Sequence, residues 1–106
     1  MFGKNAYRNK RLLEAVRDSP CQCCGRQDGT IVAAHSNQLR DGKGRGLKAS
    51  DAMIAALCFK CHSELDQGKD MSRTERVEMW ELAHRRTICW LFEHGYLNVN
   101  ANPKIQ

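Results

Sequence analysis

The sequence predicts a small α+β fold with a short helix near the N-terminus and a long helix near the C-terminus. Apolar residues recur every three to four positions between Val77 and Leu91, which is the period of a helix face. Residues 30–34 form a short β-prone run. Two cysteine pairs, each with two residues between its members, flank that run; they are Cys21 with Cys24 and Cys58 with Cys61.

Length and charge limit the classes of protein that this chain can be. With 106 residues, 42% of them hydrophobic, we expect one domain over residues 1–106 and a modest core that a structural metal would help to stabilise. Seventeen Lys and Arg against twelve Asp and Glu give 17 − 12 = +5, and the pI is near 9.0. This balance favours an anionic partner, most often nucleic acid; the alternative is a soluble basic protein without such a partner.

The expected compartment is the cytoplasm. Residues 1–5 lack the apolar core of a secretion signal, and no apolar run approaches the length that spans a membrane. Six cysteines without an export signal favour reduced thiols or metal ligation over disulfides.

The short N-terminal helix is expected over residues 9–18. Leu12 and Val16 lie at helical spacing among basic residues, and Pro20 follows the end of the pattern. The basic face of this helix either contacts phosphates or is simply solvated.

The middle of the chain gives weaker signals. Residues 26–35 are expected to form a short hairpin, and the polar, glycine-rich residues 36–50 an exposed loop. Residues 51–57 are apolar and fit either a strand or a helical turn.

The long C-terminal helix is expected over residues 73–94. Ser72 and Glu75 have the spacing of a capping box, and Gly95 is positioned to end the helix. Cys89, within this helix, is expected to be a small buried hydrophobe.

The paired cysteines predict a four-thiolate zinc site. Two-residue spacing lets two sulfurs bind one tetrahedral ion while backbone amides donate to the thiolates, and Gly25 permits the tight turn that follows the first pair. Cys23 is an alternative to Cys21, although its position next to Cys24 would strain the chelate. Such a closed site is structural and performs no chemistry.

Three motifs suggest a function beyond zinc binding. They are Ala33-Ala34-His35, then Leu57-Cys58-Phe59-Lys60-Cys61-His62 with Asp66 four residues on, and the glycine-rich loop with Lys48 and Asp51. This set resembles the treble-clef, zinc-containing HNH endonucleases of the His-Me finger group, whose core is a ββα-metal unit. It is also similar to short prophage-encoded nucleases once catalogued as a domain of unknown function. The resemblance covers residues 21–66 and, more loosely, the C-terminal helix.

The resemblance implies a metal-dependent endonuclease that acts on DNA in a bacterial cytoplasm. His35 would be the general base, and His62 and Asp66 would bind a divalent ion. Histidine titrates near neutral pH, and His62 and Asp66 share one face if residues after Cys61 are helical. Mixed nitrogen and oxygen ligation suits Mg²⁺, Mn²⁺, Ni²⁺ or Zn²⁺.

Some features of the family's pattern are missing. Ala34 stands where many of these enzymes carry an acid or a histidine that also binds the ion. The family's base-orienting asparagine has no clear counterpart, and Asn37 and Asp51 are the candidates. Four cations are natural phosphate contacts, with a solvated loop as the alternative: Arg40, Lys43, Arg45 and Lys48.

Two other functions remain open. The chain can be a non-catalytic zinc module that binds DNA or a phage or host protein. It can also form a homodimer through the C-terminal helix, whose Trp80, Trp90 and Phe92 exceed what a small core readily covers.

Overall fold

The fold was obtained as a computed structural model, which describes residues 7–44 and 46–100. Within this part of the chain three α-helices surround a sheet of two antiparallel strands, which confirms the predicted α+β class. The elements, in order, are α1 (Lys10–Val16), β1 (Val32–His35), a 3-10 turn η1 (Leu39–Asp41), β2 (Ile54–Leu57), α2 (Phe59–Gln67) and α3 (Arg73–Glu93).

The sequence did not predict that the segments of these two strands pair with each other. β1 pairs with β2 in a register that sets Val32 opposite Leu57 and His35 opposite Ile54. The hairpin expected within residues 26–35 is therefore wrong: its second half is a strand, but the partner lies beyond a long loop. The undecided segment 51–57 supplies that partner because all four residues of β2 are buried and apolar.

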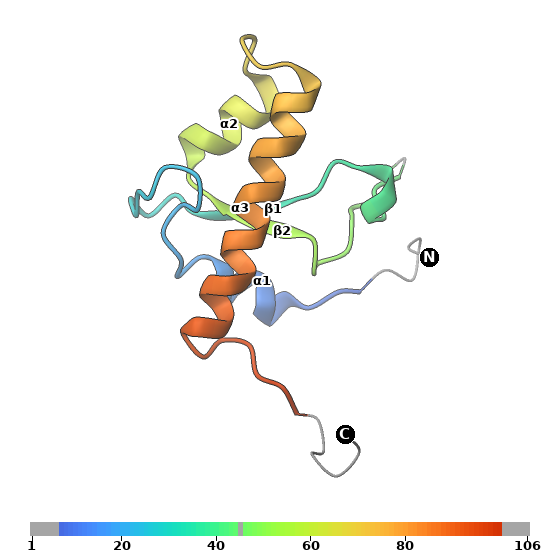
Figure 1. The fold of residues 1–106 in the computed structure, drawn as a ribbon. Coiled ribbons are helices and arrows are strands. Elements are labelled where there is room, and N and C mark those ends of the chain that lie inside the picture. Colours follow the sequence, from blue (N-terminus) through green and yellow to red (C-terminus); the bar gives the residue numbers. More distant parts are fainter. Residues whose placement is uncertain (1–6, 45, 101–106) are drawn as a thin grey trace.

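The long helix α3 covers the sheet and seals its edge. In Figure 1 it crosses both strands, with α2 beside its first turns and α1 near its other end. Trp80 Nε1 donates a 2.9 Å hydrogen bond to the Ala34 carbonyl. Thr87 Oγ1 accepts the Ala56 N–H at 2.9 Å and donates to the Ala83 carbonyl at 2.7 Å. The free edge of β2 is thus paired through a side chain, where a third strand would otherwise be needed.

The ends of the helices follow the sequence signals. Ser72 Oγ accepts the Glu75 N–H, and the Glu75 carboxylate accepts the Ser72 N–H, which is the predicted capping box. Gly95, two residues after the end of α3, has φ +79°, a conformation that only glycine adopts without strain. Asn9 caps α1 by accepting the Leu12 N–H.

Two expectations about exposure need correction. The loop expected to be exposed over residues 36–50 turns partly inward: Ser36 and Asp41 are buried, and their side chains share a 2.6 Å hydrogen bond that compensates for lost hydration. Cys89 is exposed. It lies two residues from both Thr87 and Leu91, and therefore on the opposite side of α3 from the buried face.

No helix in the described ranges is both long enough and apolar enough to cross a membrane.

The side chain that pairs the edge of β2 can be tested by mutation. We expect Thr87→Val to lower the free energy of unfolding by about 1–3 kcal/mol, because the buried Ala56 N–H then has no acceptor. Thr87→Ser keeps the hydroxyl and is expected to lose less. Chemical denaturation of both variants measures the difference, and a Val variant as stable as the wild type would contradict the role given to Thr87.

Candidate functional site

Four of the six cysteines converge on one point. One sulfur from each lies within 4.8 Å of all the others, in a set made by Cys21, Cys24, Cys58 and Cys61. The first two follow α1, whereas the last two open α2. Cys23 is exposed and is not a member of this set.

The two halves of the cluster have the same local design. The Cys24 N–H donates to Cys21 Sγ, and the Cys61 N–H donates to Cys58 Sγ, both at 3.5 Å. Gly25, with φ +81°, closes the first turn by donating to the Cys21 carbonyl. Cys58 is also the N-cap of α2, so its sulfur replaces the usual cap oxygen.

The cluster requires a cation if all four of its thiols are to ionise together. Burial raises the pKa of Cys61, and the neighbouring sulfurs of Cys58, Cys21 and Cys24 raise it further. For Cys21, burial acts in the same direction, but backbone N–H donors outweigh it and lower the pKa to about 7. Four thiolates this close repel one another unless a positive ion lies between them. Four sulfurs within 4.8 Å of one another are compatible with tetrahedral zinc.

A second group of polar residues lies at the other end of the sheet. His35 ends β1, and its Nε2 is 2.7 Å from Oδ1 of Asp51, in the loop before β2. Burial raises the pKa of Asp51, yet the hydrogen bonds from His35 and from the Asn9 N–H outweigh it and bring the pKa below its ordinary value. An ionised carboxylate only accepts hydrogen bonds. Nε2 of His35 therefore carries a proton, and Nδ1 carries the lone pair when the ring is neutral.

The pair predicted on α2 is also close together. His62 Nε2 lies 3.3 Å from Asp66 Oδ2, and both side chains are about two-fifths exposed, so they can reach solvent or a ligand together. Among the described residues, no third His, Cys, Asp or Glu joins them in a ready-made group of ligands. An ion held here would take its remaining ligands from water or substrate.

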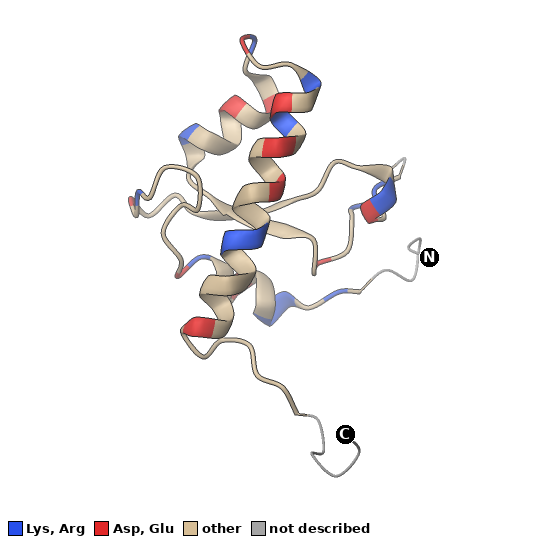
Figure 2. Cartoon of the chain, viewed as in Figure 1, with Lys and Arg blue, Asp and Glu red and all other residues tan. Residues whose placement is uncertain are grey.

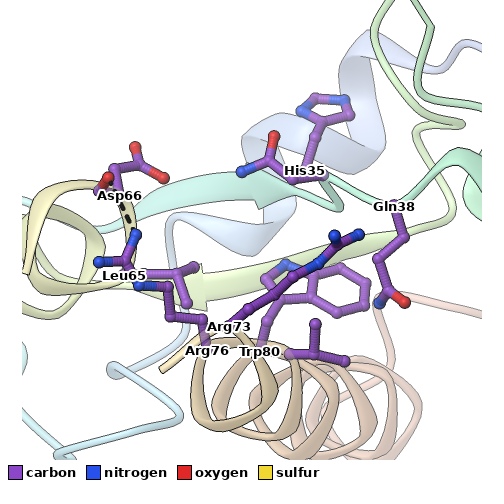
Figure 3. A pocket seen from close by; sticks show the side chains of 9 residues that line it. His35, Gln38, Leu65, Asp66, Arg73, Arg76 and Trp80 are labelled. Carbon is purple, nitrogen blue, oxygen red and sulfur yellow. Dashed lines mark hydrogen bonds between the residues drawn. The ribbon is translucent and has the colours of Figure 1, made fainter. Parts of the chain in front are cut away.

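His35 and Asp66 line one pocket of about 160 Å³ between the end of β1, α2 and the start of α3. Its walls are formed by His35, Asn37, Gln38, Leu65, Asp66, Arg73, Arg76, Val77 and Trp80. In Figure 3 Asp66 and His35 lie on opposite sides of the opening, with the His35 ring directed away from Trp80 and α3. Arg73 extends from α3 toward the His35 side.

The two pocket arginines have different surroundings. The Arg76 guanidinium donates to the carbonyls of Asp66 and Gly68, and its Nε to that of Met71, so it fastens the turn between α2 and α3. Arg73, the first residue of α3, is exposed at the pocket. Arg73 is therefore the cation that is better placed to meet a bound anion.

The loop cations predicted to contact phosphate differ in their surroundings where the structure describes them. Arg40 makes an ion pair with Glu81 of α3, and Lys48 is exposed, whereas Lys43 is only half-exposed. Arg45 lies outside the described residues. Figure 2 shows basic residues spread over the loop, the N-terminal segment and α3, interleaved with acidic residues along α2 and the first half of α3.

The remaining histidines have structural partners. His84 stacks on Trp80 at 4.9 Å between ring centroids, and its Nδ1 lies 2.7 Å from the Ile54 carbonyl. His94 stacks on Trp90, and its Nδ1 lies 2.9 Å from the Trp90 carbonyl at the end of α3. The contacts of His84 join α3 to β2, and those of His94 support the end of α3.

Sequence reasoning missed the contributions of Arg73 and of the N-terminal segment. An arginine that follows an N-cap resembles any other helical surface residue, and only the fold places it at the pocket that His35 lines. For Asp51 there was a signal, an acid within a polar loop, but its register against His35 depends on the pairing of β1 with β2.

Comparisons of the chain with protein-family models, with curated proteins and with solved structures found no match.

The membership of the cluster can be tested through metal content. We expect the purified protein to bind one zinc ion, Cys21→Ser to lose most of it, and Cys23→Ser to retain it, because only Cys21 lies within 4.8 Å of the other three sulfurs. Elemental analysis together with thermal unfolding measures both effects, since the metal's binding energy adds to folding. If only the Cys23 variant loses zinc, Cys23 is the ligand and Cys21 is not.

Proposed function

We propose that this protein is a metal-dependent endonuclease that hydrolyses phosphodiester bonds in DNA, with a treble-clef core like that of the zinc-containing HNH endonucleases. One observation supports this more than any other. His35, hydrogen-bonded to an acid through one ring nitrogen, lines the same pocket as Asp66 and Arg73. A base, a carboxylate ligand and a cation are the groups that phosphodiester hydrolysis requires.

In this proposal His35 is the general base. Asp51 holds the proton on Nε2, so Nδ1 is the nitrogen that can accept one. The His35 side chain is 17% exposed, which leaves it accessible to water while its position remains fixed. The asparagine that orients the base in the family is then replaced by a carboxylate that bonds to the ring directly.

His62 and Asp66 would hold the divalent ion. Their donor atoms are 3.3 Å apart and partly exposed, and one imidazole with one carboxylate suits Mg²⁺, Mn²⁺, Ni²⁺ or Zn²⁺. Such an ion, when bound, would offset negative charge on the phosphate and on the leaving oxygen. Because Ala34 supplies no ligand, water or substrate would fill the other positions.

The reaction then balances simply. A water molecule gives one proton to Nδ1 of His35 while the water oxygen bonds to phosphorus. The bond from phosphorus to one ester oxygen then breaks. The departing oxygen takes a proton from solvent, which leaves an alcohol and a phosphate monoester. Arg73 would bind a non-bridging phosphate oxygen across the pocket from Asp66.

The four-cysteine cluster would have a structural role in this enzyme. A zinc ion there would bind the loop after α1 to the first turn of α2, the helix that carries His62 and Asp66. The net charge of +5 would draw DNA to the surface, and Lys43, Arg45 and Lys48 would contact phosphates along the strand. Cytoplasmic location and a dimer through α3 belong to the same proposal.

A non-catalytic zinc module that binds DNA or a protein is the second candidate. The observation that favours it is the short ligand set, with His62 and Asp66 alone in the described part of the chain and Ala34 in place of a third ligand. Such a module would bind its partner equally well without His35 or the divalent ion.

Cleavage of supercoiled plasmid distinguishes the two candidates. With Mg²⁺ or Mn²⁺ we expect the wild type to nick or linearise the plasmid and His35→Ala to be slower by at least about 10²-fold, the usual contribution of a general base. His62→Ala and Asp66→Ala should each require more metal. His94→Ala is the matched control, because this exposed histidine lies at the far end of α3 and should leave the rate unchanged.

Two results would count against the proposal. Cleavage by His35→Ala at the wild-type rate would remove His35 as the base. Metal-independent DNA binding by all variants, without cleavage by any of them, would favour the non-catalytic module.

A further inference from the structure

We propose that Arg8 is a positioning residue, which fixes the Asp51 carboxylate and through it the imidazole of His35. This inference rests on the proposed function, because it assigns the means by which the base is held. The N-terminal segment then forms part of the site, although it is remote in sequence from every motif that suggested the site.

Arg8 binds the loop before β2 at three points. Its Nη1 donates to the Ala49 carbonyl at 2.6 Å, and its Nη2 donates to the Lys48 carbonyl at 2.8 Å. Nη1 is also 3.5 Å from Oδ1 of Asp51, the same oxygen that accepts the hydrogen bond from His35. The planar guanidinium thus spans the loop backbone and the acid together, which a lysine cannot do.

The other oxygen of Asp51 is fixed from the same segment. Oδ2 accepts the Asn9 N–H at 2.7 Å, while the Asp51 N–H donates to the Tyr7 carbonyl at 2.9 Å. Asn9 is itself fixed, since its side chain caps α1, whose Leu12 is buried in the core. The chain of contacts therefore runs from the core through Asn9 and Asp51 to His35.

Orientation of the base depends on this chain of contacts. A carboxylate held at both oxygens cannot rotate about its Cβ–Cγ bond, so Oδ1 stays aimed at Nε2 of His35. Without Arg8, Oδ1 loses its neighbouring cation and the loop loses two hydrogen bonds to its backbone, so Asp51 can shift and its hydrogen bond to His35 is no longer held in one geometry. Asp51 is 4% exposed and the Arg8 side chain 44%, so Arg8 acts at the rim of the site and contributes little to the core.

The test uses the zinc-loaded chain of 106 residues and three variants. Arg8→Ala removes the guanidinium and its charge, whereas Arg8→Lys keeps the charge but not the planar guanidinium. Arg11→Ala, an exposed arginine on α1, is the matched control for loss of one positive charge. Plasmid cleavage with Mn²⁺ gives kcat and KM, and two-bond ¹H–¹⁵N correlation spectra of histidine-labelled protein, recorded where the rings are neutral, give the tautomer of His35.

We expect Arg8→Ala to lower kcat by about tenfold or more, since a small misplacement of a reacting group can cost up to 10²-fold, with KM changed less than twofold. Its His35 ring should show a mixture of tautomers, where the wild type and Arg11→Ala show the proton on Nε2. Arg8→Lys should fall between them.

The inference is overturned if Arg8→Ala keeps both the wild-type kcat and a single Nε2–H tautomer. If the alanine variant does not fold, the same result for Arg8→Lys overturns it. If the wild type does not cleave DNA, the proposed function fails, but the spectra still decide whether Arg8 holds His35. A change of tautomer in the Arg8 variants alone then supports the positioning role at a site with another function.

Discussion

The convergence of four sulfurs at the start of α2 is the constraint on which the rest of this fold depends. Four of the eight strand residues are alanine, so the sheet gives the core few large side chains. The helix α2 has only nine residues, too few to persist as a helix in isolation. Because Cys58 caps α2 and Cys61 lies in its first turn, the cluster determines where that helix begins and in which direction it points. The position of His62 and Asp66 follows from that direction.

A second set of contacts acts at the opposite end of the sheet. There the long loop between the strands is held by the N-terminal segment, through the backbone of Asn9 and the side chain of Arg8. The cluster and this set of hydrogen bonds act on different sides of one pocket, the first on Asp66 and the second on His35. A chain with a small core can therefore fix two distant side chains by polar and thiol contacts, where a larger protein would use packing.

The extent to which the sequence predicted this arrangement depended on how local each signal is. The capping box of α3, the glycine after it and the two cysteine turns involve contacts within a few residues, and each was predicted where it occurs. The partner of β1 was missed because pairing across a long loop is set by burial of β2 beneath α3, which no local pattern records. Cys89 was misassigned because its helical face is decided by which side of α3 meets the sheet. The sequence left Asn37 and Asp51 as alternatives for orienting the base, and the choice of Asp51 depends on strand register. The position of Arg73 at the pocket depends on helix packing, so only the assembled fold reveals it.

We propose that a divalent ion binds to His62 and Asp66, and that Asp66 lies across a pocket from His35, the base. Anomalous diffraction from crystals of the zinc-loaded protein soaked in Mn²⁺ tests it most directly, because zinc and manganese are distinguished by their absorption edges. We predict zinc among the four cysteines and a separate manganese bound by His62 and Asp66 on the side that faces His35. Zinc in the cluster with no manganese at His62 and Asp66 would contradict the claim and favour the non-catalytic module.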